Sequence, residues 1–295
     1  MEKILWLKSK QNLASKHISL LSIQLPFLRA VFYFYTMDKH PIGVFDSGVG
    51  GLSLLGELQT LLPHEDFIYI SDKAFAPYGA LTAADILDRS EKLTNWLIKQ
   101  SSKLIVVACN TATTNAIDAL RQTHPIPFVG IEPAIKPAAL QTKTGVVGVL
   151  ATKGTLSSKL FHQTSSVYGQ GITIVEKEGK HLVKMIEEGK INSDEIKNLL
   201  QTYLQPMIEQ GADHLVLGCT HYPFLTPVLK KILPKNIQIV DCNGSVAKQV
   251  ERVLEKRKLH SISENKGNTT YFCTGDSQTM RQFVLSEEIK ALSIP

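Results

Sequence analysis

Short apolar runs alternate with helix-like patterns along most of this chain, and the alternation restricts its fold more than any other feature. Strands are expected at residues 42–45, 67–70, 104–108, 128–131, 146–150, 172–175, 215–217, 237–240 and 270–273. Helical spacing fills most of the gaps, and Asn192 with Glu195 resembles the capping box of a helix running toward Gln210. Because right-handed helical crossovers join parallel strands economically, the sequence predicts an α/β protein with parallel sheets.

The length of the chain corresponds to about two domains. It has 295 residues, of which 43% are hydrophobic and 20% charged, so it can bury a substantial core. A proline-rich stretch at 132–137 is the best candidate for a domain boundary, and a second candidate lies near 241–243.

Residues 1–36 differ from the rest, being first basic and then apolar. A signal peptide or membrane anchor is one interpretation, but Pro26 and Arg29 interrupt the apolar run, which is shorter than the 18 or so residues of a spanning helix. We expect instead a dispensable extension, or a start assigned too far upstream, because Met37 lies five residues before the first convincing strand.

Charge and cysteine content indicate the setting of the protein. Residues 1–36 carry +4 of the net charge of +5, so the remainder is nearly neutral and offers no basic face for nucleic acid. The four cysteines are widely and irregularly spaced, unlike a secreted disulfide framework. We therefore expect a reducing, cytoplasmic location.

Two of these cysteines stand at the ends of predicted buried strands. Cys219 follows the run 215–217 and precedes Thr220 and His221, while Cys109 follows 104–108 and precedes Asn110 and Thr111. Ligands of open α/β sheets bind at the carboxyl ends of the strands. A lone buried cysteine is usually a small hydrophobe, but the repetition of one arrangement on two loops suggests a functional pair.

Zinc binding and hydrolysis are alternative chemistries for these thiols. Zinc fits poorly, because its ligands are expected in short pairs such as C-x-x-C, and Cys219 with His221 gives only half a site. A hydrolase with one thiol and a histidine base remains open. Cys242 and Cys273 are interpreted as structural.

Three further loops are candidates for binding a ligand. The glycine-rich segment 43–51 lacks nucleotide-motif spacing, but its backbone N–H groups could approach an anion, and Asp46 and Ser47 are placed to hold an ammonium group. The loop 76–79 offers Tyr78 and the amide of Gly79, and the segment 151–155 offers two hydroxyls. Taken alone, each of the last two is equally well or better explained as a turn or a capped helix start.

Together these segments resemble the aspartate/glutamate racemase family, and within it the glutamate enzymes rather than the aspartate or hydantoin relatives. The motifs run in order from about residue 40 to 241 and comprise FDSGVGGLS at 45–53, PYG at 77–79, ACNTAT at 108–113, PAIKPA at 133–138, ATKGT at 151–155 and LGCTHYP at 217–223. Residues 1–36 lie outside the resemblance.

The resemblance implies two similar open parallel-sheet α/β lobes, pseudo-twofold related and facing each other across a cleft. Residues 37–133 and 243–295 would form the first lobe, and 134–242 the second. Such a relation would present one thiol to each face of a small substrate.

The implied chemistry is racemisation of glutamate without a cofactor or metal, which supplies D-glutamate for peptidoglycan. Inverting an α-carbon requires removing a proton on one face and returning one on the other, so Cys109 and Cys219 would be the two acid/base groups. The implied substrate-binding residues are Asp46, Ser47, Tyr78, Gly79, Asn110, Thr111, Thr220 and His221. Of these, Asp46 and His221 would also adjust proton transfer at the two thiols.

We expect a small-molecule substrate, a homodimer, and neither nucleic acid nor membrane as a partner. Two other functions stay open at this point: racemisation of aspartate or another amino acid derivative on the same fold, and a thiol-dependent hydrolase or ligand-binding protein.

Overall fold

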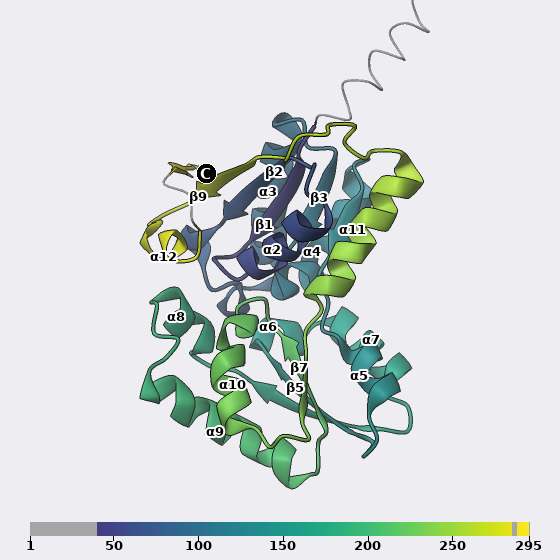
Figure 1. The fold of residues 1–295 in the computed structure, drawn as a ribbon, viewed down its shortest axis with the longest axis vertical. Coiled ribbons are helices and arrows are strands. Elements are labelled where there is room, and N and C mark those ends of the chain that lie inside the picture. The colour runs from purple at the N-terminus through teal and green to yellow at the C-terminus, as the bar shows by residue number, and fades with distance from the viewer. Residues whose placement is uncertain (1–39, 285–287, 295) are drawn as a thin grey trace, which may run out of the picture. The chain divides into compact units, whose positions relative to one another are not determined.

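The larger of two sheets has six parallel strands (Figure 1). The computed structural model describes residues 40–284 and 288–294, so the expectations for residues 1–36 lie outside it. The strand order is β10-β9-β2-β1-β3-β4. These strands are β1 (Ile42–Asp46), β2 (Phe67–Ser71), β3 (Leu104–Val107), β4 (Phe128–Gly130), β9 (Thr269–Cys273) and β10 (Ile289–Ala291).

A second, four-stranded sheet is built from the middle of the chain. Its order is β6-β5-β7-β8, and all of its pairs are parallel. The strands are β5 (Val146–Ala151), β6 (Thr173–Glu178), β7 (His214–Gly218) and β8 (Gln238–Val240). The expected fold class, two α/β lobes with parallel sheets, is confirmed. The boundaries proposed between the lobes stay predictions.

Helices connect the strands, as the alternating pattern predicts. They are α2 (Leu52–Leu61), α3 (Ala83–Lys99), α4 (Asn110–Thr123), α5 (Ile135–Gln141), α6 (Lys153–Leu156), α7 (Lys159–Tyr168), α8 (Leu182–Glu187), α9 (Asp194–Glu209), α10 (Thr226–Ile232), α11 (Asn243–Arg257) and α12 (Gln278–Arg281). Short 3₁₀ turns occur at Lys73–Phe75, Tyr78–Ala80 and Tyr222–Leu225.

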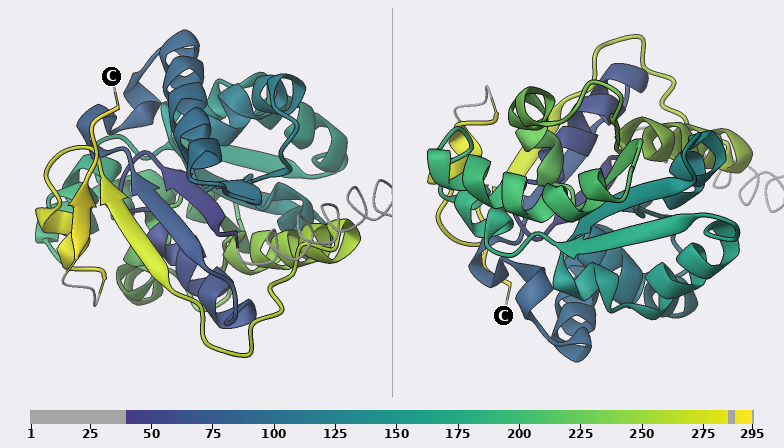
Figure 2. Two further views of the ribbon diagram at one scale, coloured as in Figure 1. Left: turned by 90° about the horizontal axis from the view of Figure 1, so that it is seen from above. Right: turned by 90° about the horizontal axis from the view of Figure 1, so that it is seen from below.

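Alternate residues of the first sheet enter two different cores. Val44 and Val106 pack on one face with α2 and α11, whereas Phe45 and Ile105 pack on the other with α3 and α4. Both faces of the sheet are therefore covered, which explains why its strands read as continuous apolar runs. In Figure 2 the yellow C-terminal strands lie beside the blue strands from the first part of the chain, in agreement with the β2–β9 pairing.

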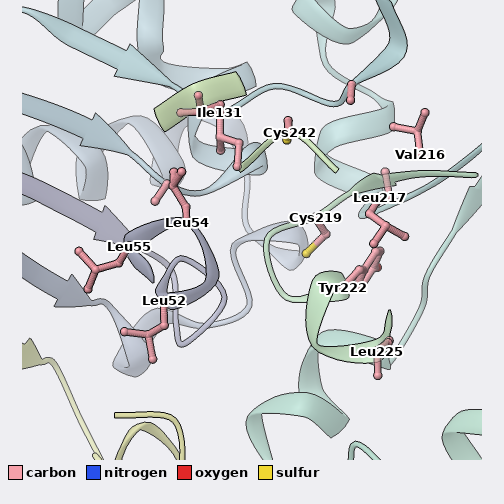
Figure 3. Close-up of a cluster of buried hydrophobic side chains, with 14 of the residues drawn as sticks. Leu52, Leu54, Leu55, Ile131, Val216, Leu217, Cys219, Tyr222, Leu225 and Cys242 are labelled. Atoms are coloured by element: carbon pink, nitrogen blue, oxygen red, sulfur yellow. The ribbon is translucent and has the colours of Figure 1, made fainter. Parts of the chain in front are cut away.

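The first of these cores continues into the second lobe. Leu54 and Leu55 of α2 belong to the same buried cluster as Leu217 of β7 and Tyr222 (Figure 3). Full burial of such a side chain contributes about 1.5–3 kcal/mol, so this shared core holds the two lobes together.

Two details differ from the sequence-based expectations. The N-cap of α9 is Ser193, whose hydroxyl accepts a hydrogen bond from the N–H of Ile196, so a single serine cap takes the place of the capping box expected from Asn192 and Glu195. Strand β10 was not expected at all. Within the described ranges, every helix is too short or too polar to cross a membrane.

Candidate active site

The two cysteine loops meet at the carboxyl ends of strands from different lobes. Cys109 follows β3 and is the N-cap residue of α4, while Cys219 follows β7. Asp46, the last residue of β1, accepts a hydrogen bond of 2.8 Å from the hydroxyl of Thr220 in the other lobe. The loops are thus tied together across the lobes, as the ligand-binding edge of parallel sheets would require.

Both cysteines line one small cavity between these loops, about 250 Å³ including space open to solvent. Nine of the ten predicted site residues contribute to its wall, and the tenth, Asp46, lies directly behind Thr220. The complete lining consists of Ser47, Pro77, Tyr78, Gly79, Cys109, Asn110, Thr111, Thr152, Val183, Cys219, Thr220 and His221.

Cys109 is buried in an environment that keeps it protonated. Its Sγ donates to the hydroxyl of Ser47 at 3.6 Å. Burial raises the pKa of the Cys109 thiol to about 12, and the nearby charge of Asp46 adds to the rise. The thiol form is therefore the resting form of Cys109.

Asp46 is a fully buried carboxylate with an altered acidity. Burial raises the pKa of Asp46 to about 6, although the positive charge of His221 and hydrogen bonds from Thr220 and Gly48 oppose the rise. The Gly48 N–H lies 2.7 Å from Oδ1. Asp46 can thus gain or lose a proton near neutral pH, as an acid/base group requires.

A histidine and a carboxylate stand behind the second thiol. His221 Nδ1 lies 3.8 Å from Cys219 Sγ, and its Nε2 lies 2.6 Å from Oε1 of Glu187. Burial alone would lower the pKa of His221, but its hydrogen bonds to Cys219 and Glu187 raise that pKa well above the usual range. An imidazolium therefore separates the thiol from the carboxylate.

Glu187 is ionised under all ordinary conditions. Burial would raise the pKa of Glu187, but hydrogen bonds from His221 and Lys73 and the charge of His221 outweigh it and lower the pKa to about 2. The Lys73 ammonium and the Val49 N–H each donate to this carboxylate at 2.7 Å. Because Val49 and Lys73 belong to the first lobe, Glu187 also links the lobes.

Comparison with known proteins identifies the family of this chain. Residues 53–250 match the family described as Asp/Glu/Hydantoin racemase. The chain belongs to this racemase family. The resemblance expected from the sequence is confirmed, and with it the isomerase class.

Individual members of this racemase family are similar to the chain over most of its length. The glutamate racemase of Herpetosiphon aurantiacus is 43% identical over 240 residues, which cover 81% of this chain and 94% of that protein. The Escherichia coli glutamate racemase in complex with L-glutamate and the activator UDP-MurNAc-Ala superimposes with a TM-score of 0.76 at 32% identity, covering 87% of this chain and 99% of that one. The Francisella tularensis enzyme in complex with D-glutamate gives 0.76 at 28% identity, covering 87% and 98%.

In this member of the racemase family, the glycine loop serves a purpose that the sequence did not suggest. A Cβ added at Gly48 would lie 1.9 Å from Oε1 of Glu187, and one at Gly50 would lie 2.4 Å from Nδ1 of His221. The glycines therefore admit side chains of the second lobe. The loop does contact an anion, but that anion is the protein's own Glu187 carboxylate.

The hydroxyl of Tyr78 is directed at a buried ion pair. It donates to Asp72 at 2.6 Å, and the guanidinium of Arg89 contacts both oxygens of the same carboxylate at 2.9 and 3.1 Å. Burial and the charge of Asp72 raise the pKa of Tyr78, so the hydroxyl stays protonated. Tyr78 lines the cavity, but its hydroxyl already has a protein partner.

The cavity wall also carries threonine hydroxyls and one unpaired acceptor. The hydroxyls of Thr111, Thr152 and Thr155 lie 2.8 to 3.4 Å from one another. Oδ1 of Asn110 is buried and finds no hydrogen-bond partner among the described residues. An unmatched buried acceptor costs about 1–3 kcal/mol, which a ligand donor would recover.

The sequence did not identify three contributors to the site, namely Glu187, Lys73 and Val183. Glu187 and Val183 lie on α8 beside apolar Leu182 and Ile186, and no motif marks them. The one signal that could have identified Glu187 is its position as an acidic residue among the apolar residues of a short helix. No group of three or more His, Cys, Asp or Glu side chains within 40–284 and 288–294 is arranged to hold a metal ion.

Proposed function

We propose that this protein interconverts L-glutamate and D-glutamate by a two-base mechanism in which Cys109 and Cys219 act on opposite faces of the α-carbon. The observation that carries the proposal is the cavity lined by one thiol from each lobe. The glutamate racemases at 41–44% identity support the choice of substrate.

The mechanism needs one thiolate and one thiol at a time. The thiolate takes the α-proton, and the thiol on the other face returns a proton to the same carbon, so each turnover exchanges their protonation states. Following the family resemblance, Cys219 acts on L-glutamate and Cys109 on D-glutamate.

Each thiol has its own proton-transfer partner. Asp46, with a pKa of about 6, lies near Cys109, and its carboxylate favours the Cys109 thiol that returns a proton. When Asp46 takes up a proton, it no longer opposes formation of the Cys109 thiolate. His221, held by Glu187, directs Nδ1 at Sγ of Cys219 and can donate a hydrogen bond to its thiolate. Burial of Cys109 opposes ionisation, so we infer that the substrate ammonium group helps to form its thiolate.

The polar wall of the cavity suits the remaining groups of glutamate. Oδ1 of Asn110, an unpaired acceptor, is placed to accept from the ammonium group, together with Ser47. We expect the hydroxyls of Thr111 and Thr152 and the backbone N–H of Gly79 to bind the carboxylates, while Thr220 lines the cavity with a hydroxyl that already donates to Asp46. Tyr78 contributes its ring, because its hydroxyl is bound to Asp72.

The wider role follows from this reaction. We infer that the enzyme needs neither cofactor nor metal, acts in the cytoplasm as a homodimer, and supplies D-glutamate for peptidoglycan synthesis. Retention of activity after dialysis against chelator and treatment with hydroxylamine is the expected result, and loss of activity that added metal restores would contradict it.

The deciding experiment is to incubate the purified protein with L-glutamate and follow circular dichroism. The signal should decay to zero as the racemic mixture forms, and L-aspartate should react far more slowly. The side-chain carboxylate of aspartate is one methylene short, which leaves its donors unmatched. An unchanged glutamate signal would overturn the proposal, and comparable rates would transfer it to aspartate.

A further inference from the structure

A second, larger cavity adjoins the one that contains the thiols. It measures about 1070 Å³, including space open to solvent. Four residues line both cavities, namely Pro77, Gly79, Thr152 and Val183. The outer cavity therefore lies directly against the inner one, on a side where the inner cavity is walled by the PYG loop and α8.

The outer cavity is strongly basic. Lys153, Lys180 and Lys184 line it and are exposed, and Glu178 is the one acidic residue in its described lining. Lys184 is 71% exposed, and its neighbour Glu188 lies 3.9 Å away but only 2.7 Å from Lys190.

This concentration of lysines contrasts with the rest of the protein. Residues 37–295 as a whole carry a net charge of only +1. Here three lysines from two segments of the chain converge on one cavity against a single acidic lining residue, Glu178, which is an excess of positive charge that residues 37–295 as a whole do not show. Because they line the cavity that adjoins the two thiols, they favour an anionic ligand there.

We propose that Lys153, Lys180 and Lys184 form a cationic entrance that attracts the glutamate anion and holds it near the inner cavity. The inference rests on the proposed function and specifies how its substrate is gathered. Glutamate carries two carboxylates and one ammonium group, so it is a net anion. A cleft of one charge sign with low-dielectric walls concentrates counter-ions by about 10-fold or more.

The lysines act on binding and leave the chemical step unchanged. They lie outside the inner cavity, so they stabilise the bound substrate and the transition state to a similar extent relative to free substrate. Removing an interaction of this kind raises KM and leaves kcat unchanged. The attraction also weakens with salt, because the Debye length falls from about 30 Å at 0.01 M to about 3 Å at 1 M.

The test compares two triple variants with the unaltered enzyme. One is Lys153→Gln/Lys180→Gln/Lys184→Gln, and the matched control removes the same charge from exposed Lys230, Lys231 and Lys235 of the same lobe, which line neither cavity. At low ionic strength kcat/KM of the entrance variant should fall by about tenfold through KM, while the control stays near the parent value. The difference should disappear as salt approaches roughly 1 M.

Other results would overturn the inference. An entrance variant with the KM and salt dependence of the parent would show that the lysines are only a solvated surface. An equal fall in the control would reveal a general effect of net charge. If the unaltered protein fails to racemise glutamate, the proposed function is refuted, and the entrance is then tested by calorimetric titration with D-glutamate. The inference requires that the affinity for D-glutamate drops in the entrance variant and not in the control.

Discussion

Asp46 is the residue whose ionisation should set the acidic side of the pH–rate profile. Its pKa of about 6 means that the carboxylate forms as pH rises through that value, so kcat/KM should rise there. The alkaline fall should come much higher, because the pKa of Cys109 is about 12. Asp46→Asn should lower activity and abolish the rise near pH 6. A profile flat from pH 5 to about 8 in the parent would contradict this role.

Glu187 should matter far more than its neighbour Glu188. Glu187→Gln removes the carboxylate that holds His221, so kcat should fall by about 10–100-fold, comparable to losing part of a positioned acid/base group. Glu188→Gln is the matched control, because Glu188 is a surface residue paired with Lys190. Steady-state kinetics on both variants decide, and similar rates in the two would refute the assignment.

The same pair should differ in acid stability. The pKa of Glu187 is lowered in the folded state, so its stabilising contribution is present above the unfolded pKa of about 4.3 and is lost as pH falls toward about 2. Urea unfolding from pH 5 to about 2 should therefore lose less stability in Glu187→Gln than in Glu188→Gln. Parallel curves would show that the Glu187 charge is not stabilised by folding.

At this scale the sequence predicted the residues that follow strands and did not predict the ones on α8. Asp46, Cys109 and Cys219 stand where buried runs end, and this position marks the ligand edge of a parallel sheet. Glu187 reaches the site only through the packing of α8 against the other lobe. Local pattern carries no information on such a contact.

At the level of elements, the turn from β1 to α2 should tolerate no side chain at Gly50. In Gly50→Ala the new Cβ would overlap His221, so the lobes must separate, and activity should fall by roughly 100-fold. Gly56→Ala on α2 is the control, because its Cβ meets no heavy atom within 4 Å in the described structure. That variant should gain about 0.5–1 kcal/mol of stability with full activity. Equal behaviour of the two variants would exclude the close-approach explanation.

The buried pair of Asp72 and Arg89 anchors the loop that carries Tyr78. Arg89→Met leaves the Asp72 carboxylate buried without its cation and should cost about 3–5 kcal/mol of unfolding free energy. Tyr78→Phe removes one hydrogen bond to the same carboxylate and should cost only about 1 kcal/mol. Denaturant unfolding measures both, and equal losses would mean that the ion pair is not what holds Asp72.

Element boundaries show where local signals fail. Ser193 replaces Asn192 as the cap of α9 because its hydroxyl reaches the N–H of Ile196, and either residue type is a good cap. Strand β10 is only three residues long and largely exposed, so its residues show no apolar run. It forms by pairing with β9, a tertiary event that the sequence of the segment does not encode.

For the whole molecule, local patterns predicted strands and helices but not their distribution between two sheets. β9 pairs with β2 across some 200 residues of sequence, as Phe67 opposite Thr269 shows. Alternating strand and helix patterns indicate that the strands are parallel and buried, but they do not predict which strands share a sheet. The two-lobed arrangement came from family resemblance, and the contacts between the lobes came only from the structure.

The central claim is that each lobe supplies one base to one face of the substrate. Isotope exchange in deuterated water tests it most directly, using Cys109→Ala, Cys219→Ala and, as control, Cys273→Ala, which alters a buried cysteine outside the cavity. Racemisation should fall by at least about 10²–10⁴-fold in the first two variants and persist in the control.

Exchange needs only one face, so the surviving thiol should still act on the enantiomer whose α-proton points toward it. We predict that Cys219→Ala incorporates deuterium into D-glutamate alone and Cys109→Ala into L-glutamate alone, as read by mass spectrometry after chiral separation. Labelling of both enantiomers by either single variant, or racemisation that survives the loss of one thiol, would show that a single base serves both faces and would contradict the account.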